Sequence, residues 1–183
     1  MEIIPLSISD IILLKPKVYE DPRGFFCEIF RQEEFQKIIS SKVNFVQENQ
    51  SKSYQGVLRG LHYQIPPYAQ GKLLRTIHGE VKVVAVDLRA SSRTFGKYVT
   101  EILSGNNKNL IWIPEGFATG ILTLSLTSEV IYKATNYYCV ESERCILWND
   151  TSLNIDWPEN FKILLSHKDL LGSNFEKSQI FVN

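Results

Sequence analysis

The stretch Val57-Leu58-Arg59-Gly60-Leu61-His62-Tyr63-Gln64, followed closely by Gln70-Gly71-Lys72-Leu73, places an arginine, a histidine and a lysine among strand-forming residues. Side chains on a β-strand alternate between its two faces. The alternation predicts that Arg59 shares a face with Leu61 and that His62 points the other way. A histidine on an inward face is a candidate acid or base, and a lysine on the next strand is a candidate anchor for negative charge.

Length and composition indicate one globular domain over residues 1–183, with a core of ordinary size. Twenty basic residues balance twenty acidic ones, which argues against nucleic acid or a membrane surface as a partner. Cys27, Cys139 and Cys145 lack CxxC spacing, so reduced thiols are favoured over disulfides or a zinc site. The N-terminus lacks the pattern of a signal peptide, and no apolar run is long enough to span a membrane. We therefore expect a cytoplasmic protein.

Short runs of strand-forming residues, separated by glycine, proline and asparagine turns, dominate the chain. Helical spacing of apolar residues appears at Gln32–Ile39, and a second helix is expected near Ser166–Leu171 with Ser166 as its N-cap. This pattern predicts a mainly β protein with a few short flanking helices, either a β-sandwich, a jelly roll or a barrel, with a ligand site in its interior. The predicted strands are Phe25–Phe30, Val43–Asn49, Leu58–Gln64, Leu73–Ile77, Val81–Leu88, Tyr98–Leu103, Leu110–Ile113, Gly120–Leu124, Val130–Ala134 and Cys145–Leu147.

Several motifs occur in an order that makes the chain recognisable. They are Asp21-Pro22-Arg23-Gly24-Phe25-Phe26-Cys27-Glu28, Gln47-Glu48-Asn49-Gln50-Ser51, the two opening stretches, Val86-Asp87-Leu88-Arg89, Thr94-Phe95-Gly96, Trp112-Ile113-Pro114-Glu115-Gly116-Phe117-Ala118, Tyr132-Lys133-Ala134-Thr135-Asn136-Tyr137-Tyr138, Trp148-Asn149-Asp150 and Ile155-Asp156-Trp157-Pro158. From about Lys17 to about Asp169 the chain resembles the dTDP-4-dehydrorhamnose 3,5-epimerase family, whose members are metal-free, cupin-like jelly rolls.

The resemblance implies a cofactor-independent epimerase acting at C3, C5 or both in a nucleotide-linked 4-keto-6-deoxyhexose, a sugar used in bacterial surface polysaccharides. The C4 ketone acidifies the neighbouring hydrogens, so the reaction needs a base, an opposing acid and positive charge near the enolate oxygen. His62 matches the family's base and Asp169 the carboxylate that orients it. Lys72 matches the residue that stabilises the enolate, and Tyr132 matches the proton donor on the opposite face.

The resemblance also implies binding residues for a nucleotide-diphosphate sugar. Arg59 would hold the diphosphate, because a forked guanidinium suits phosphate oxygens, and Tyr137 would stack near the base or sugar. In family members, further substrate-binding residues come from a neighbouring subunit, which implies a homodimer with strand exchange. The other binding residues within the subunit would be Gln47, Asn49, Thr119, Glu143 and Lys168, and those from the neighbouring subunit would be Arg23, Phe26 and Glu28.

Two positions depart from the family pattern. Family members usually have a histidine where this chain has Thr119 and an aspartate where it has Val83. We hypothesise that the two polar residues form a pair and are lost together, because a single buried partner would be left unpaired at a cost of about 1–3 kcal/mol. The change could restrict epimerisation to one carbon or alter the sugar or nucleotide accepted. Neutral drift away from the reacting atoms remains the alternative.

Four alternatives are weighed against this function. A 3,4-ketoisomerase, or a single-centre epimerase of a related sugar such as a CDP-sugar, would use the same chemistry with a different product. A non-catalytic nucleotide-sugar-binding cupin would not need His62, Lys72 and Tyr132 together with Asp169. A metal-dependent cupin is disfavoured, because the three histidines, His62, His78 and His167, include no His-x-His pair.

Overall fold

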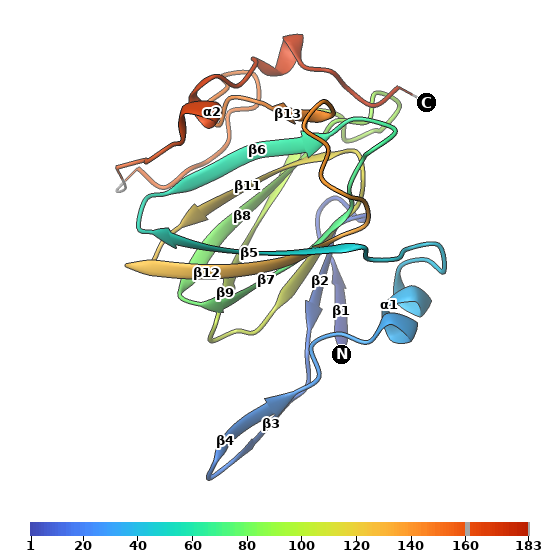
Figure 1. The fold of residues 1–183 in the computed structure, drawn as a ribbon, viewed down its shortest axis with the longest axis vertical. Helices are drawn as coiled ribbons and strands as arrows, with labels where there is room; N and C mark the ends of the chain where they lie inside the picture. The colour runs from blue at the N-terminus through green and yellow to red at the C-terminus, as the bar shows by residue number, and fades with distance from the viewer. Residues whose placement is uncertain (160–161, 183) are drawn as a thin grey trace.

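The computed structural model describes residues 1–159 and 162–182, and it confirms the predicted mainly β fold. Two antiparallel sheets face each other as a cupin jelly roll (Figure 1). The larger sheet has the strand order β1 (Glu2–Pro5), β2 (Ile12–Lys15), β10 (Leu110–Ile113), β7 (Lys72–His78), β12 (Thr127–Ala134) and β5 (Gln47–Tyr54). The smaller sheet has the order β13 (Glu143–Cys145), β6 (Leu58–Gln64), β11 (Phe117–Thr123), β8 (Glu80–Asp87) and β9 (Tyr98–Ser104).

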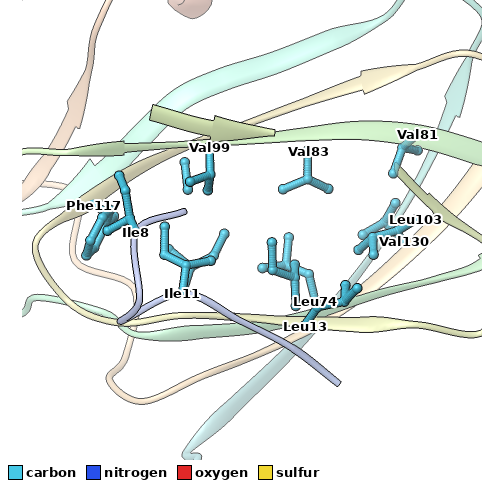
Figure 2. Close-up of a cluster of buried hydrophobic side chains, with 13 residues drawn as sticks. Ile8, Ile11, Leu13, Leu74, Val81, Val83, Val99, Leu103, Phe117 and Val130 are labelled. Carbon is cyan, nitrogen blue, oxygen red and sulfur yellow. The ribbon is translucent and has the colours of Figure 1, made fainter. Parts of the chain in front are cut away.

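The core between the two sheets follows from period-2 patterning on their strands. Val81 and Val83 point into this core from one face of β8 (Figure 2), and Ala85 belongs to the same core cluster. Val84 and Val86 point to the opposite face. The apolar layer ends at Tyr132, which packs against it while also lining a cavity. The apolar core therefore borders the polar cavity at Tyr132.

Each sheet also has a covered outer face. The C-terminal part of the chain, including α2 (His167–Leu170) and the 3₁₀ helix Phe175–Lys177, lies over the smaller sheet (Figure 1). The helix α1 (Gln32–Ile38) covers the larger sheet by packing Phe35 edge-to-face against Trp112. A hairpin of β3 (Val18–Asp21) and β4 (Gly24–Cys27) extends away from the barrel (Figure 1). No helix among the described residues is long and apolar enough to cross a membrane.

Most predicted strands are present with ends shifted by a few residues, and the strand Leu110–Ile113 has the predicted bounds. The predicted strand Phe25–Phe30 is wrong beyond Cys27, and the predicted strand Val43–Asn49 begins only at Gln47. The strands β1, β2 and β3 were not predicted. Each has only four residues, and β3 is largely polar, so pairing with a neighbour rather than hydrophobic alternation defines them.

The predicted facing of β6 is also wrong. Arg59 and His62 both line the cavity, whereas Leu61 joins Leu58 in the apolar layer on the other side of the sheet. The pairing of β6 with β11 shifts register between Thr119 and Ile121, as at a β-bulge. A bulge adds a residue to one strand and resets the alternation. His62 and Arg59 can therefore share one face.

Gly60 makes this irregular pairing possible. Its φ is +137°, a conformation that side chains rarely adopt, and an added Cβ would lie 2.6 Å from the Thr119 carbonyl oxygen. We expect Gly60→Ala to lower the free energy of unfolding by about 1–3 kcal/mol from backbone strain, with a further loss from this overlap. Urea unfolding would measure the change.

Gly24→Ala is the matched control. Gly24 has a comparable φ of +123°, but a Cβ there would meet nothing within 4 Å. Gly60→Ala should be the more destabilising variant, and it should also lose activity because Arg59 and His62 flank the altered position. Equal destabilisation by the two substitutions would show that the close approach of β11 to Gly60 does not contribute to the loss of stability.

Candidate active site

A cavity of about 430 Å³ lies between the inner faces of the two sheets. It brings together all four predicted catalytic residues, His62, Lys72, Tyr132 and Asp169. The smaller sheet contributes His62, the larger sheet contributes Lys72 and Tyr132, and α2 contributes Asp169. The other lining residues are Asn49, Gln50, Ser51, Arg59, Leu74, Thr119, Ile121, Ser166 and Lys168.

His62 and Asp169 form a close pair. The His62 Nε2 atom lies 2.5 Å from an Asp169 carboxylate oxygen, and the aspartate side chain is 4% exposed against 27% for the histidine. Burial would raise the pKa of Asp169, but the close contact with His62 and the hydrogen bond from Ser166 outweigh it and lower that pKa to about 2. The aspartate is therefore ionised at neutral pH and stabilises a protonated imidazole.

A capping box fixes the position of Asp169. The Ser166 hydroxyl donates to an Asp169 carboxylate oxygen at 2.7 Å and accepts from the Asp169 backbone N–H at 3.2 Å. The backbone N–H of Gly60 donates to the other carboxylate oxygen at 3.4 Å. The N-cap role predicted for Ser166 is confirmed, and the same contacts hold the carboxylate toward His62.

Lys72 extends from the larger sheet toward β6. Its Nζ donates to the backbone carbonyl of His62 at 3.3 Å, so the ammonium group lies beside the candidate base. Burial lowers the pKa of Lys72 to about 8, and the negative charge of Glu143 partly opposes this shift. The ammonium form predominates at neutral pH and carries the charge that an enolate oxygen requires.

The pKa of Lys72 predicts an alkaline limit to activity. If the ammonium form stabilises the enolate, kcat/KM should fall as pH rises through about 8, because Lys72 then loses its proton. Lys72→Arg keeps the positive charge, so its residual activity should lack this alkaline decline. A pH series of kcat/KM on both proteins would check this. The same decline in Lys72→Arg would assign it to another group.

Tyr132 and Arg59 complete the polar lining. Burial raises the pKa of Tyr132, as does the negative charge of Glu143, so its phenol carries a proton at neutral pH. The Arg59 Nε donates to the Ser53 hydroxyl at 3.0 Å, and another guanidinium nitrogen donates to the Lys52 carbonyl at 3.3 Å. A guanidinium held at the cavity wall can bind an anionic group.

The remaining predicted binding residues of the subunit fall into two groups. Asn49, Thr119 and Lys168 line the cavity. Gln47, Glu143 and Tyr137 do not. Gln47 bonds to Asn49 and to the backbone of Tyr138. Glu143 forms an ion pair with Lys168 and lines a neighbouring groove, and Tyr137 is 62% exposed.

Arg23, Phe26 and Glu28 lie on or beside the projecting β3–β4 hairpin and not at this subunit's cavity. Arg23 pairs with Asp21 and Glu28 with Arg31, both at the surface. Phe26 is 71% exposed. These residues are available to another molecule.

Thr119 and Val83, the two positions expected to depart from the family pattern, both face the barrel interior. Thr119 pairs with His62 across β11 and β6, and its hydroxyl is buried without a hydrogen-bond partner among the described residues. Val83 is 1% exposed in the apolar core, opposite Ile121. The sites therefore share one wall of the barrel, with Thr119 at the cavity and Val83 beneath it.

Sequence reasoning missed some cavity residues. Ser51 follows Asn49 at the two-residue spacing of β5, where inward positions are polar, so alternation on a correctly placed strand would have found it. Ser166 was predicted only as a helix cap, although the Ser-x-x-Asp spacing to Asp169 signals reciprocal hydrogen bonding. The hydroxyl contacts of Ser53 with Arg59 depend on a tertiary arrangement and leave no sequence signal.

Comparisons with known proteins agree on one family. The family model described as dTDP-4-dehydrorhamnose 3,5-epimerase matches residues 5–177. A dTDP-4-dehydrorhamnose 3,5-epimerase from Shigella flexneri is 52% identical over 182 residues, which is 100% of both chains. The crystal structure of a dTDP-6-deoxy-D-glucose-3,5-epimerase from Legionella pneumophila in complex with dTDP-4-keto-L-rhamnose has a TM-score of 0.94 at 44% identity, over 97% of this chain and 94% of that one.

A further similar structure is that of an enzyme that epimerises a single carbon. It is a 3′-monoepimerase from Streptomyces bikiniensis in complex with dTDP-quinovose. The TM-score is 0.88 at 29% identity, and the match covers 94% of this chain and 87% of that one. Proteins of this shape therefore include both double and single epimerases.

Proposed function

This chain belongs to the dTDP-4-dehydrorhamnose 3,5-epimerase family, and from that premise we propose that His62 and Tyr132 exchange protons on opposite faces of its sugar substrate. The protein is an isomerase that epimerises a nucleotide-linked 4-keto-6-deoxysugar. The observation that supports these residue roles is the convergence of His62, Lys72, Tyr132 and Asp169 on one cavity from two facing sheets and α2.

The reaction begins when His62 takes a proton from the carbon next to the C4 ketone. The electron pair of the broken C–H bond forms the enolate, whose oxygen is stabilised by the Lys72 ammonium. The imidazolium formed is stabilised by the Asp169 carboxylate 2.5 Å away. Tyr132 then donates its phenolic proton to the opposite face of the same carbon, which inverts the centre. Exchange with solvent returns His62 to its neutral form and Tyr132 to its protonated form.

The nucleotide diphosphate would lie toward Arg59, where Ser53 and the Lys52 carbonyl hold the guanidinium in place. The names of the relatives favour dTDP over CDP as the nucleotide. Asn49 and Thr119 line the cavity and would contact the sugar, while Tyr137 and Glu143 would contact the substrate from the rim of the cavity. The three free thiols favour a reducing, cytoplasmic compartment, and surface polysaccharide synthesis is the process that such a sugar would feed.

A homodimer would bring the hairpin residues to a second active site. The hairpin extends beyond the barrel (Figure 1). Its Phe25 and Phe26 side chains are 59% and 71% exposed. Burying such side chains against another subunit removes apolar surface from water. Arg23, Phe26 and Glu28 would then contact the nucleotide bound in the partner subunit.

Product analysis in D₂O tests the proposed reaction. Incubation with dTDP- and CDP-4-keto-6-deoxyglucose should place deuterium at C3, C5 or both of the dTDP-sugar, as read by NMR. Deuterium and inversion at one carbon would support a single-centre epimerase, the second candidate that Thr119 and Val83 favour. A carbonyl moved from C4 to C3 would identify a ketoisomerase. Tight binding of the sugar without exchange would contradict the catalytic roles assigned here.

Mixed subunits test the homodimer. His62→Ala would disable the base, and Arg23→Ala would disable the hairpin contact, so each variant alone should be weakly active. Refolding the two together should restore activity, because a mixed dimer contains one site with both residues intact. Light scattering would give the oligomeric state. A monomer in solution, or no recovery on mixing, would contradict the shared site.

A further inference from the structure

Cys145 lies directly beside the His62–Asp169 pair. It is the cross-strand partner of His62 where β13 pairs with β6. One ligand atom each from His62, Cys145 and Asp169 lies within 4.8 Å of the other two, and this is the one such group of three among the described residues. The mechanism proposed above gives the thiol no role.

The donor set suits a thiophilic divalent cation. Zn²⁺ binds imidazole nitrogen, thiolate sulfur and carboxylate oxygen at about 2.0–2.3 Å, usually with four ligands. Three donors this close need only small side-chain rotations to reach one ion, and the fourth position could be taken by water from the cavity. Mg²⁺ and Ca²⁺ prefer oxygen ligands and would not gain from the sulfur.

The surrounding charge also favours a cation. Burial raises the pKa of Cys145 to about 12; the negative charges of Asp169 and Glu143 add to this increase, and the positive charge of Lys168 partly opposes it. The free thiol is therefore protonated at neutral pH. A metal ion that binds displaces this proton to solvent and forms a sulfur–metal bond, and the same negative charges then attract the ion.

We propose that His62, Cys145 and Asp169 form an inhibitory site for Zn²⁺ or a similar thiophilic divalent cation. The bound ion engages the imidazole and the carboxylate of the proposed base pair, so Asp169 can no longer stabilise the imidazolium and proton abstraction stops while the ion remains bound. The inhibitory effect rests on the proposed function, whereas metal binding by these three residues does not.

Cobalt and zinc titrations test this site in the full-length protein. Co²⁺ should produce a thiolate-to-cobalt absorption band in the wild type but not in Cys145→Ser or Cys145→Ala. Added Zn²⁺ should inhibit the wild type, and loss of the sulfur ligand should weaken inhibition by about tenfold or more, since even indirect metal contacts contribute on that scale. Cys139→Ser is the matched control, because Cys139 is a free thiol outside the cluster, and it should behave like the wild type.

The outcomes separate this proposal from the proposed function. Equal Zn²⁺ inhibition of the wild type and of Cys145→Ser, or a missing thiolate band with the wild type, would overturn the metal site. A normal thiolate band in the wild type, together with full exchange activity in His62→Ala, would leave the metal site standing and reject the proposed base. Inhibition that strengthens with rising pH would support displacement of the thiol proton.

Discussion

His62→Ala is expected to lower the rate of deuterium incorporation into the substrate by about 10²–10⁴-fold, the usual contribution of a positioned general base. Loss of the imidazole leaves the Asp169 carboxylate buried at the site without its partner. NMR in D₂O would measure the loss of the C3 and C5 proton signals directly. This assay detects proton abstraction even when no inverted product forms.

The control for this substitution is His78→Ala. His78 ends β7, is exposed, and does not line the cavity, so its removal should leave the exchange rate unchanged. Asp169→Asn should lower the rate in the same direction as His62→Ala, because the neutral amide no longer stabilises the imidazolium. Exchange at the wild-type rate in His62→Ala would mean that another group removes the proton.

The fold was largely predictable from the sequence, because the alternation of apolar residues indicates most of its strands. The alternation of β8, with Val81 and Val83 on the core face and Val84 opposite, is encoded in the residues themselves. The short edge strands β1 and β3 were not predictable, since four residues give too little alternation to recognise. These strands are recognised only by the strands they pair with in the folded chain.

The family resemblance predicted which residues form the candidate site. It did not predict how those residues are arranged. Strict alternation placed Arg59 and His62 on opposite faces, and only the irregular pairing at Gly60 brings them together. A glycine in a strand can signal a bulge, yet its effect on facing depends on how closely β11 approaches. Contacts between distant segments, such as Ser166 and Gly60 holding Asp169, likewise require the folded chain.

Tyr132→Phe should separate proton removal from inversion. His62 keeps its contact with Asp169 in this variant, so the substrate should still exchange deuterium on the face that His62 contacts. Inverted product should fall by about 10²–10⁴-fold, because the opposite face has lost its proton donor. NMR would then show deuterium in recovered starting sugar with its original configuration.

The phenylalanine keeps the ring that packs against the apolar core, so the variant should unfold at nearly the wild-type urea concentration. Tyr54→Phe is the matched control, since Tyr54 is 70% exposed on β5 and lies outside the cavity lining. It should produce inverted sugar at the wild-type rate. If Tyr132→Phe also inverts the sugar normally, protonation must come from water or another side chain, and the two-sided arrangement of His62 and Tyr132 would not be the catalytic device.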